Sequence, residues 1–312
     1  MVVRNSLNTM QSMINDSMQL SQKKPYRFSL GSRVLAAWRL FLYALINLVF
    51  ISTQLVLRAI NGDKISGFPI FYHRLCCRVL GLDIITKGTQ SPHRPTLYVA
   101  NHTSYTDIIS FATLMPISFI GKQEIANWPI FGLLAKLQRT VFIDRKRHNT
   151  DAHRDSITGR LQEGDSLMLF PEGTTNDGNR LLPFRSSLFA VAETPLVHDQ
   201  RVTSSYVWVQ PVSISYTHLN GLPLGYSWRH LVAWYGDVGF AEHMWQLLRL
   251  GRVTIRIEFH EPVNITQFKS RKEMSDYCFK KVEKGFYDAI TGRPWTGPEQ
   301  LLSQDQQKAD KS

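Results

Sequence analysis

Apolar residues along the chain show two patterns, which change near residue 83. Before it they form long runs: 18 residues separate Arg39 from Arg58, and Asn47 is one of the few polar side chains among them. Beyond it, short β-branched runs alternate with stretches of helical periodicity. The change of pattern predicts a helical segment over 31–82, followed by a domain of different architecture.

The short runs predict the fold of the main domain. They alternate with helical candidates near 105–115, 128–137, 148–163, 186–195 and 273–290. Such alternation is typical of an α/β domain, and we expect a mixed, mainly parallel central sheet flanked by helices. The predicted strands are DIITKG, TLYVANH, PISFIGK, RTVFIDR, DSLMLFPEG, VWVQPVSISY and RVTIRIEFHEPV.

The ends of the chain complete the predicted domain organisation. Residues 1–30 and 298–312 are polar and predict a flexible N-terminal arm and a disordered tail. The α/β domain is expected to occupy 83–297, after a helical hairpin over 31–82.

The hairpin is expected at a membrane. The stretch between Arg39 and Arg58 has the length of the shortest helices that cross a bilayer. It starts too late for a cleaved signal peptide, and basic residues flank both of its ends, whereas a simple crossing carries them on one side. Residues 68–82 form a second apolar and basic stretch. We therefore expect a membrane-seated helical hairpin in one leaflet, its basic residues at anionic headgroups. A soluble helical cap and a single span remain alternatives.

The charge balance changes the choice of partners. The 312 residues include 36 Lys and Arg against 25 Asp and Glu, a formal net charge of +11, and the isoelectric point is about 9.6. This excess favours acidic lipid headgroups, an acidic carrier protein or nucleic acid. Nucleic acid is the weakest of these, because the sequence has no zinc-ligand spacing, helix-turn-helix pattern or RNA-binding sheet signature.

The cysteines do not predict a disulfide framework or a metal site. Cys76 and Cys77 are adjacent and poorly placed to bridge each other, and no histidine cluster joins them or Cys278. We expect no metal, and core thiols in a reducing compartment.

Polar side chains follow four of the predicted strands. In open α/β sheets, ligands bind beyond the carboxyl ends of the strands, so these side chains are candidates for a common site. They are Asn101-His102, Lys122, Asp144-Arg145 and Glu172-Gly173-Thr174.

His102 and Asp107 form a candidate catalytic pair. Their spacing fits a histidine in a strand-to-helix turn and a carboxylate in the first turn of the next helix, where it would bind one ring nitrogen and leave the other free as a base. No GxSxG motif supplies a serine nucleophile, so the nucleophile would be a hydroxyl of the substrate. A His-Asp pair that merely caps a helix is the alternative.

Three basic residues are candidates for binding an anion beside this pair. Lys122, Arg145 and Arg185 follow predicted strands or open a helix, and arginine suits bidentate recognition of phosphate or carboxylate. A solvated rim of surface cations is the alternative.

Several motifs together resemble the glycerolipid acyltransferase family. NHTSYTD resembles the family's N-H-x4-D box and FPEGTT its F-P-E-G-T signature. GKQEIANWPIFG, VFIDR, LPFRSSLF and VQPVSI are similar to its other segments, in the same order over about 96–215. By texture the chain is most similar to bacterial 1-acylglycerol-3-phosphate acyltransferases and lyso-ornithine lipid acyltransferases.

The resemblance implies a role for each matching residue. His102 would be the general base and Asp107 its orienting carboxylate. Glu172, Gly173 and Thr174 would hold the acceptor near the base.

The same resemblance implies that Arg145, Lys122 and Arg185 bind an anionic headgroup. Helix N-terminal amides near Thr103–Tyr105 would be candidates for stabilising the oxyanion.

The resemblance also implies the reaction and its setting. A fatty acyl chain would pass from an acyl carrier protein or coenzyme A thioester to a lysolipid hydroxyl, without an acyl-enzyme and without a cofactor. We expect 1-acyl-sn-glycerol-3-phosphate as the acceptor, giving phosphatidic acid. The enzyme would lie at the cytoplasmic face of a bacterial inner membrane.

Two departures from the family pattern keep a second acceptor open. Thr175 stands where members that act on lysophosphatidic acid commonly carry arginine, and Arg185 stands where they carry lysine. The missing arginine makes lyso-ornithine lipid an alternative acceptor, unless Arg180 or Arg185 supplies the charge. More distant alternatives are a lipid hydrolase that uses the pair on water and a non-catalytic peripheral membrane protein.

Overall fold

The structure is a computed structural model that describes residues 31–61, 67–143, 150–196, 205–292 and 300–301. The features below belong to one compact unit, Ser32–Ser312. The predicted arm 1–30 lies outside the described residues. Of the predicted tail 298–312, only Gln300–Leu301 is described.

A single mixed sheet forms the centre of the described chain. Its strand order is β12-β1-β10-β8-β2-β5-β3-β4, and β9 and β11 both pair with β8. The strands are β1 Leu82–Lys87, β2 Thr96–Ala100, β3 Ser118–Lys122, β4 Val141–Ile143, β5 Leu167–Leu169, β8 Trp208–Leu219, β9 Leu222–Pro223, β10 Val253–Phe259, β11 Val263–Asn264 and β12 Gln300–Leu301.

The strand directions place several polar strand ends at one edge of this sheet. β8, β2, β5, β3 and β4 are parallel to their neighbours in this order, whereas β10 runs antiparallel to β8. The carboxyl ends of β2, β5, β3 and β4 therefore point the same way. Two short strands, β6 Pro195–Leu196 and β7 Ser205–Tyr206, pair separately. The predicted mixed, mainly parallel sheet is confirmed.

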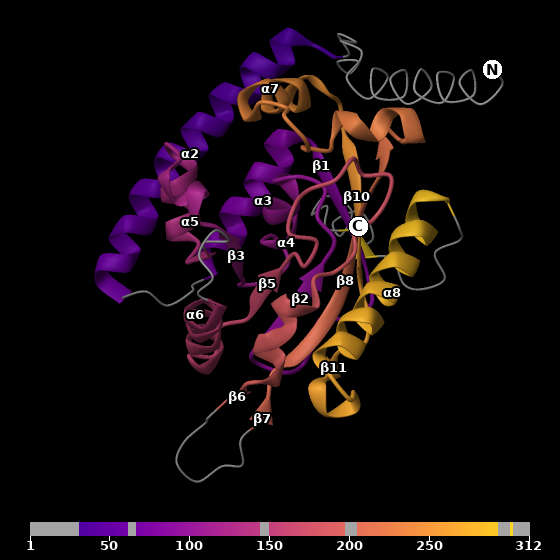
Figure 1. Ribbon diagram of the computed structural model, residues 1–312. Helices are drawn as coiled ribbons and strands as arrows, with labels where there is room; N and C mark the ends of the chain where they lie inside the picture. Colours follow the sequence, from indigo (N-terminus) through magenta and orange to yellow (C-terminus); the bar gives the residue numbers. More distant parts are fainter. Residues whose placement is uncertain (1–30, 62–66, 144–149, 197–204, 293–299, 302–312) are drawn as a thin grey trace, which may run out of the picture. The chain divides into compact units, whose positions relative to one another are not determined.

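Helices cover both faces of the sheet (Figure 1). The α-helices are α2 Arg33–Asn61, α3 Phe68–Leu80, α4 Thr106–Phe111, α5 Phe131–Leu137, α6 Thr150–Gln162, α7 Phe240–Arg249 and α8 Arg271–Ile290. Short 3₁₀ helices are η1 Gln123–Asn127, η2 Ser186–Glu193, η3 Tyr226–Leu231 and η4 Ile265–Gln267.

The alternation along β2 divides the core into two layers. Leu97 and Val99 pack into a cluster with residues of α6, η2 and α8. Tyr98 and Ala100 point the other way, into a cluster with residues of α3, α4 and α7. Because successive side chains of a strand face opposite sides, a fully buried strand needs helices on both faces, as Figure 1 shows.

The seven predicted strands are all present, and most predicted helices are present with shorter bounds. The candidate at 186–195 is the 3₁₀ helix η2. Helix α7 was not predicted, although four of its residues are buried on one face: His243, Met244, Leu247 and Leu248.

Helix α2 is the longest helix of the described residues. It is the one described helix long and apolar enough to cross a membrane, over Arg33–Ile60, and only 22% of its most apolar window is buried. Its inner face packs on α3, where the Phe50 and Tyr72 ring centroids lie 3.8 Å apart and the Tyr72 hydroxyl donates to Asn47 Oδ1 at 2.8 Å. Arg39 donates to the Leu250 carbonyl beyond the end of α7 at 2.6 Å. These contacts fix α2 to the domain and leave most of its surface open.

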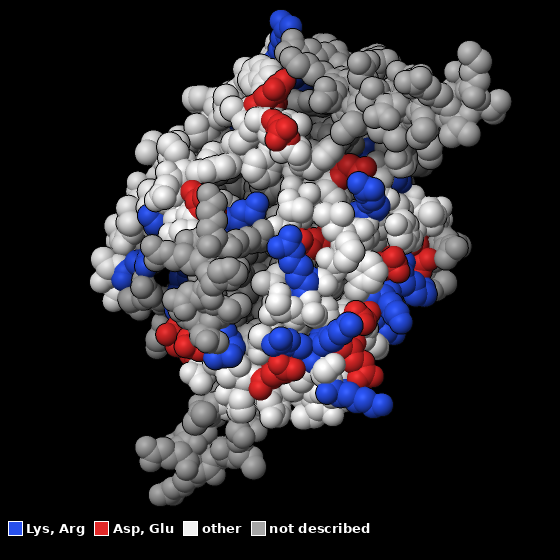
Figure 2. Space-filling view, viewed as in Figure 1, with Lys and Arg blue, Asp and Glu red and all other residues white. Residues whose placement is uncertain are grey.

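Charge is not concentrated over α8. Figure 2 shows Lys and Arg side chains intermingled with Asp and Glu side chains there, as the α8 sequence RKEMSDYCFKKVEKGFYDAI requires. On this face the net positive charge of the chain therefore does not form a large patch of one sign.

Candidate active site

The loop that follows β2 is tied to the neighbouring strand by a buried amide. The β2–β8 ladder ends at the pair Ala100 and Val212. The Asn101 side chain then donates to the Ile214 carbonyl and accepts from the Ile214 amide, both at 2.9 Å. Asn101 thus replaces one step of the ladder, and the chain can turn away from the sheet with its buried polar groups satisfied.

His102 and Asp107 meet in the geometry that their spacing predicted. His102 lies in the turn, Asp107 lies in the first turn of α4, and His102 Nδ1 is 2.8 Å from Asp107 Oδ2. The Asp107 side chain is fully buried, whereas that of His102 is 17% exposed. The pair therefore joins the buried carboxylate of Asp107 to the partly exposed ring of His102.

The hydrogen bonds of Asp107 define the state of the histidine. Its Oδ2 accepts from the amides of Thr103 at 2.7 Å and Ser104 at 3.0 Å, and its Oδ1 accepts from the Tyr216 hydroxyl at 2.6 Å. A carboxylate that accepts from so many donors is ionised, so the hydrogen between it and the ring belongs to Nδ1. His102 Nε2 then carries a lone pair, and it has no hydrogen-bond partner among the described residues. This is the arrangement of a general base.

The amides of this loop correct one expectation. Those of Thr103 and Ser104 bind Asp107 and are therefore not free to stabilise an oxyanion. They hold the orienting carboxylate instead.

Glu172 is engaged within the chain. It is 2% exposed, and its Oε1 accepts from the His102 amide at 2.9 Å. Its Oε2 accepts from Asn176 Nδ2 at 2.7 Å and from the Leu182 amide at 3.0 Å. Both oxygens are therefore engaged within the chain, and Glu172 ties the 172–182 loop to the histidine. That Glu172 holds the acceptor stays a prediction.

Burial changes the acidity of Glu172. It raises the pKa of this carboxyl from its ordinary value of 4.5 to about 7, while the three hydrogen bonds act in the opposite direction. The negative charge of Asp107 adds to the rise.

The histidine ring is also held by stacking. Its centroid lies 4.0 Å from that of Phe170 with the planes 13° apart. Its backbone carbonyl accepts from the Asn176 amide at 3.2 Å. The ring is therefore fixed on one face by Phe170 and at Nδ1 by Asp107, which leaves Nε2 as its open edge.

The predicted cationic residues lie farther from the base. Lys122 ends β3, which is two strands from β2 and therefore about 10 Å away at the usual strand spacing. Lys122 and Arg185 are both exposed. The structure does not bring Lys122 into contact with the His-Asp pair, and Arg145 lies outside the described residues.

Arg185 lies over the FPEGTT loop. Gly173 has φ = +77°, a conformation that favours glycine, and a Cβ at this position would lie 3.1 Å from the Arg185 guanidinium carbon. Thr174 beside it is exposed, and Thr175 is half-buried. The guanidinium is thus next to the loop that Glu172 ties to His102.

Sequence reasoning missed two side chains that hold the site. They are Asn176 and Tyr216, which bind Glu172 and Asp107 respectively. Asn101 was a candidate from its place after a predicted strand, and the structure shows that it binds the β8 backbone. Asn176 directly follows the FPEGTT motif, so attention to the polar residue next to that motif would have raised it as a candidate. Tyr216 gave no signal beyond its place at the end of an apolar strand.

The thiols and possible metal ligands add no further candidate. Cys76, Cys77 and Cys278 are free and buried, as expected of core thiols. Within the described ranges, no group of three or more His, Cys, Asp or Glu side chains is arranged to hold a metal ion.

An apolar groove lies between α2, α5 and α7. Its volume is about 540 Å³, and residues of α2, α5 and α7 line it, among them Leu40, Ala44, Leu48, Phe131, Phe240 and Met244. Tyr105, three residues after His102, contacts two of these: its ring centroid is 4.9 Å from that of Phe240, and its hydroxyl is 3.7 Å from the Met244 sulfur. The lining of the groove is therefore in contact with the loop that carries His102.

Comparison with known proteins agrees with this geometry. A family model described as Acyltransferase matches residues 83–215. The chain is 36% identical over 253 residues to the lyso-ornithine lipid O-acyltransferase of Rhizobium meliloti (strain 1021), a match that covers 81% of this chain and 86% of the relative. It is 30% identical over 200 residues to the 1-acyl-sn-glycerol-3-phosphate acyltransferase of Neisseria meningitidis serogroup B (strain MC58), covering 63% and 71%.

The fold also matches a solved structure. The crystal structure of the 1-acyl-sn-glycerophosphate (LPA) acyltransferase PlsC from Thermotoga maritima superposes with a TM-score of 0.51 and 20% identity, over 83% of this chain and 99% of that one. An α/β sheet with a His-Asp pair in the loop after one of its strands, together with these relatives, defines the class as an acyl-transferring enzyme. The chain belongs to the acyltransferase family.

Proposed function

We propose that this enzyme transfers a fatty acyl chain from a thioester to the hydroxyl of a lysolipid, with His102 as the general base. The observation that carries the proposal is the His102–Asp107 pair, whose 2.8 Å contact leaves Nε2 open at the edge of the sheet. Asp107 fixes the tautomer and stabilises the imidazolium that forms when His102 takes a proton.

The proposed step needs no group other than the two substrates and the histidine. The acceptor oxygen attacks the thioester carbonyl while its proton passes to His102 Nε2. An oxygen–carbon ester bond forms, the carbon–sulfur bond breaks, and the proton on His102 neutralises the leaving thiolate. The donor is the thioester of an acyl carrier protein or of coenzyme A, which is a substrate, so the reaction uses no resident cofactor.

We propose lyso-ornithine lipid as the acceptor and lysophosphatidic acid as the second candidate. The relative named for lyso-ornithine lipid is more similar, and over a longer stretch, than the one named for 1-acyl-sn-glycerol-3-phosphate. Thr175 supports the same order, because the arginine expected next to a phosphate headgroup is missing there. This reverses the order expected from the sequence motifs.

The exposed cations are proposed to bind the carboxylate or phosphate of the acceptor. Arg185 lies over Gly173, and Lys122 ends a strand at the same edge of the sheet. Arg145 is proposed for the same role from the sequence. Glu172 is proposed to position the His102 backbone, since its oxygens are engaged by the chain.

The groove between α2, α5 and α7 is proposed to take an acyl chain. Its lining is almost wholly apolar and contacts Tyr105. The outer surface of α2 is proposed to face lipid, because large apolar side chains are exposed along it: Val34, Trp38, Phe41, Leu45, Leu48, Val49, Leu55, Val56 and Ile60. We place the enzyme at the cytoplasmic face of a bacterial inner membrane, where buried free thiols stay reduced.

A parallel assay tests the proposal. Purified enzyme is given one labelled acyl donor and, separately, lyso-ornithine lipid, lysophosphatidic acid, another lysophospholipid or water. We expect ester formation with lyso-ornithine lipid to be the fastest. Release of free fatty acid at the same rate without acceptor would show a hydrolase instead.

Thr175→Arg sharpens the assignment of the acceptor. An added guanidinium beside Gly173 should raise the rate with lysophosphatidic acid relative to lyso-ornithine lipid, because a phosphate monoester gains more from arginine than a zwitterionic headgroup does. Ser187→Arg, at an exposed position of η2 with no assigned role, is the control for added charge alone. Equal effects of both substitutions would contradict a specific role for position 175.

A further inference from the structure

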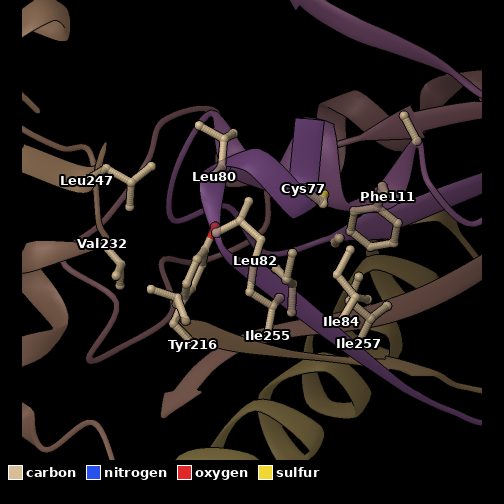
Figure 3. Packing of buried hydrophobic residues seen from close by; sticks show 14 of the residues in the cluster. Cys77, Leu80, Leu82, Ile84, Phe111, Tyr216, Val232, Leu247, Ile255 and Ile257 are labelled. Atoms are coloured by element: carbon tan, nitrogen blue, oxygen red, sulfur yellow. The ribbon is translucent and has the colours of Figure 1, made fainter. Parts of the chain in front are cut away.

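Tyr216 lies in the hydrophobic core but carries one polar atom. It belongs to β8, it is 3% exposed, and its ring is part of the cluster that includes Leu82, Val232 and Ile255. Figure 3 shows the ring between Val232 on one side and Leu82 and Ile255 on the other. A buried hydroxyl needs a partner, so its contacts decide what it does.

The hydroxyl of Tyr216 binds the orienting carboxylate. It donates to Asp107 Oδ1 at 2.6 Å, because an ionised carboxylate only accepts. Thr106 Oγ1 is 2.5 Å from the same hydroxyl oxygen and therefore donates to it. A chain of hydrogen bonds thus runs from Thr106 through Tyr216 to Asp107, and His102 binds the other oxygen of that carboxylate.

The two oxygens of Asp107 are held unequally. Oδ2 accepts from His102 Nδ1 and from the amides of Thr103 and Ser104. Within the described residues, Oδ1 accepts from Tyr216 alone. Asp107 is fully buried, so without Tyr216 this oxygen would lose its donor in a place that water does not reach.

Tyr216 stays protonated under all working conditions. Burial raises its pKa well above the ordinary value, and the nearby charge of Asp107 adds to the rise. The hydroxyl is therefore a permanent donor and never competes with His102 as a base.

We propose that Tyr216 is a positioning residue for acyl transfer. Its hydroxyl orients Asp107 and reduces the negative charge that this carboxylate presents to His102. His102 is thereby held in the right tautomer and still releases its proton. This inference rests on the proposed function. It assigns a role to a core residue of β8 that does not itself touch the substrate.

The titratable groups around Asp107 limit how a pH effect can be interpreted. His102 and Tyr105 lie on its own loop, Tyr216 faces it from β8, and Glu172 acts on it from the loop after β5. Burial raises the pKa of Glu172 to about 7, so a change in a rate profile can come from this carboxyl as well as from the histidine. A direct measurement on His102 is therefore needed as well.

The first experiment compares Tyr216→Phe with Tyr98→Phe. Tyr98 is also a buried tyrosine of the same cluster, on β2, and its hydroxyl has no hydrogen bond among the described residues. We expect Tyr216→Phe to lower kcat about ten-fold, with KM for the acceptor nearly unchanged, because the lost bond is to a charged group that acts through His102. The acid limb of the rate profile should move to higher pH by roughly half a unit, since a less neutralised Asp107 stabilises the imidazolium more. Tyr98→Phe should change neither.

The second experiment follows His102 directly. In enzyme labelled with ¹³C-histidine, the His102 signal is assigned by its absence in His102→Ala, and its titration midpoint is compared between wild type and Tyr216→Phe. We expect the midpoint to move to higher pH by the same amount as the acid limb. Neither the titration midpoint of His102 nor the pH of the acid limb depends on the fraction of enzyme that is folded. Partial unfolding of the variant therefore does not hide the result.

The outcomes separate the two proposals. Suppose that wild type transfers acyl chains, while Tyr216→Phe matches Tyr98→Phe in kcat, in the pH of the acid limb and in the titration midpoint of His102. The proposed role of Tyr216 is then wrong and the proposed function stands. If wild type transfers to no acceptor, the proposed function fails, and the His102 midpoint still decides whether Tyr216 acts on the pair.

Discussion

The loop that carries His102 and the exposed rim that carries Lys122 and Arg185 differ in how firmly their functional atoms are held. Asp107 is fully buried, and its two oxygens accept four hydrogen bonds. His102 is stacked on Phe170 and tied through its backbone to Glu172. Lys122 and Arg185, by contrast, are exposed at the strand end and at the start of η2.

This difference separates the part of the site that performs the reaction from the part that selects the lipid. A base must be held in a narrow range of geometry to act, so its support is built from buried hydrogen bonds. A headgroup can be bound by flexible, solvated cations, and these can change without disturbing the core. The same scaffold can therefore serve acceptors with different headgroups.

Removing the base should have the largest effect. His102→Ala and Asp107→Asn are expected to lower kcat by roughly 10²–10⁴-fold, as is usual for loss of general base catalysis. His218→Ala, at a half-buried histidine of β8, is the matched control and should retain activity. Wild-type activity should fall as the pH drops and the imidazole becomes protonated, because a protonated imidazole cannot accept the proton of the acceptor hydroxyl. Near-normal rates in His102→Ala or Asp107→Asn would refute the roles assigned to these two residues.

Removing a rim cation should have a smaller effect of a different kind. Lys122→Ala and Arg185→Ala should raise KM for the acceptor roughly five-fold with little change in kcat, because exposed charges bind weakly through solvent. Added salt should reduce the difference from wild type. Lys280→Ala, an exposed cation of α8, is the control. A fall in kcat instead of a rise in KM would mean that these cations take part in the reaction itself. They would then not differ in role from His102 and Asp107.

Filling the groove should have a smaller effect again and change chain-length preference. Ala44→Phe adds bulk to the groove lining and should slow transfer of long acyl chains roughly two- to five-fold relative to short ones. Ala37→Phe adds the same bulk at an exposed position of α2 that does not line the groove. A series of acyl donors of increasing length measures the effect. An identical profile for the two variants would show that the groove does not hold the chain.

The smallest expected effect concerns stability and Glu172. Burial raises the pKa of this carboxyl from 4.5 to about 7, so over that interval the folded chain holds a proton that the unfolded chain has released. The free energy of unfolding should therefore fall as the pH rises from about 4.5 to about 7 and level off above.

Glu172→Gln does not titrate and isolates this contribution. The melting temperature of wild type minus that of Glu172→Gln should decrease by roughly 5 °C across this interval. A pKa change from 4.5 to about 7 corresponds to about 3 kcal/mol, and about 1 kcal/mol shifts the melting temperature of a chain of this size by roughly 1.5 °C. Thermal unfolding at several pH values measures it. A difference that stays constant with pH would mean that the pKa of Glu172 is the same in the folded and the unfolded chain.

The sequence by itself determined the local elements and the chemistry of the base. The strands were predictable because their short β-branched runs are bounded by polar or turn residues, and TLYVA is buried at all five positions. The spacing of His102 and Asp107 places both in one turn between a strand and a helix, which is a local matter. The motif order was sufficient to indicate the family.

Only the tertiary structure decided which distant residues support that base. Tyr216 lies 109 positions from Asp107 and Glu172 lies 70 from His102, and they meet because β8 and β5 flank β2 in the sheet. The groove likewise needs α2, α5 and the unpredicted α7 together. Periodicity reports which side of an element is buried, but strand order and long-range packing arise from the whole chain folding at once. The sequence therefore does not distinguish a tyrosine that only packs in the core from one that also positions a catalytic residue.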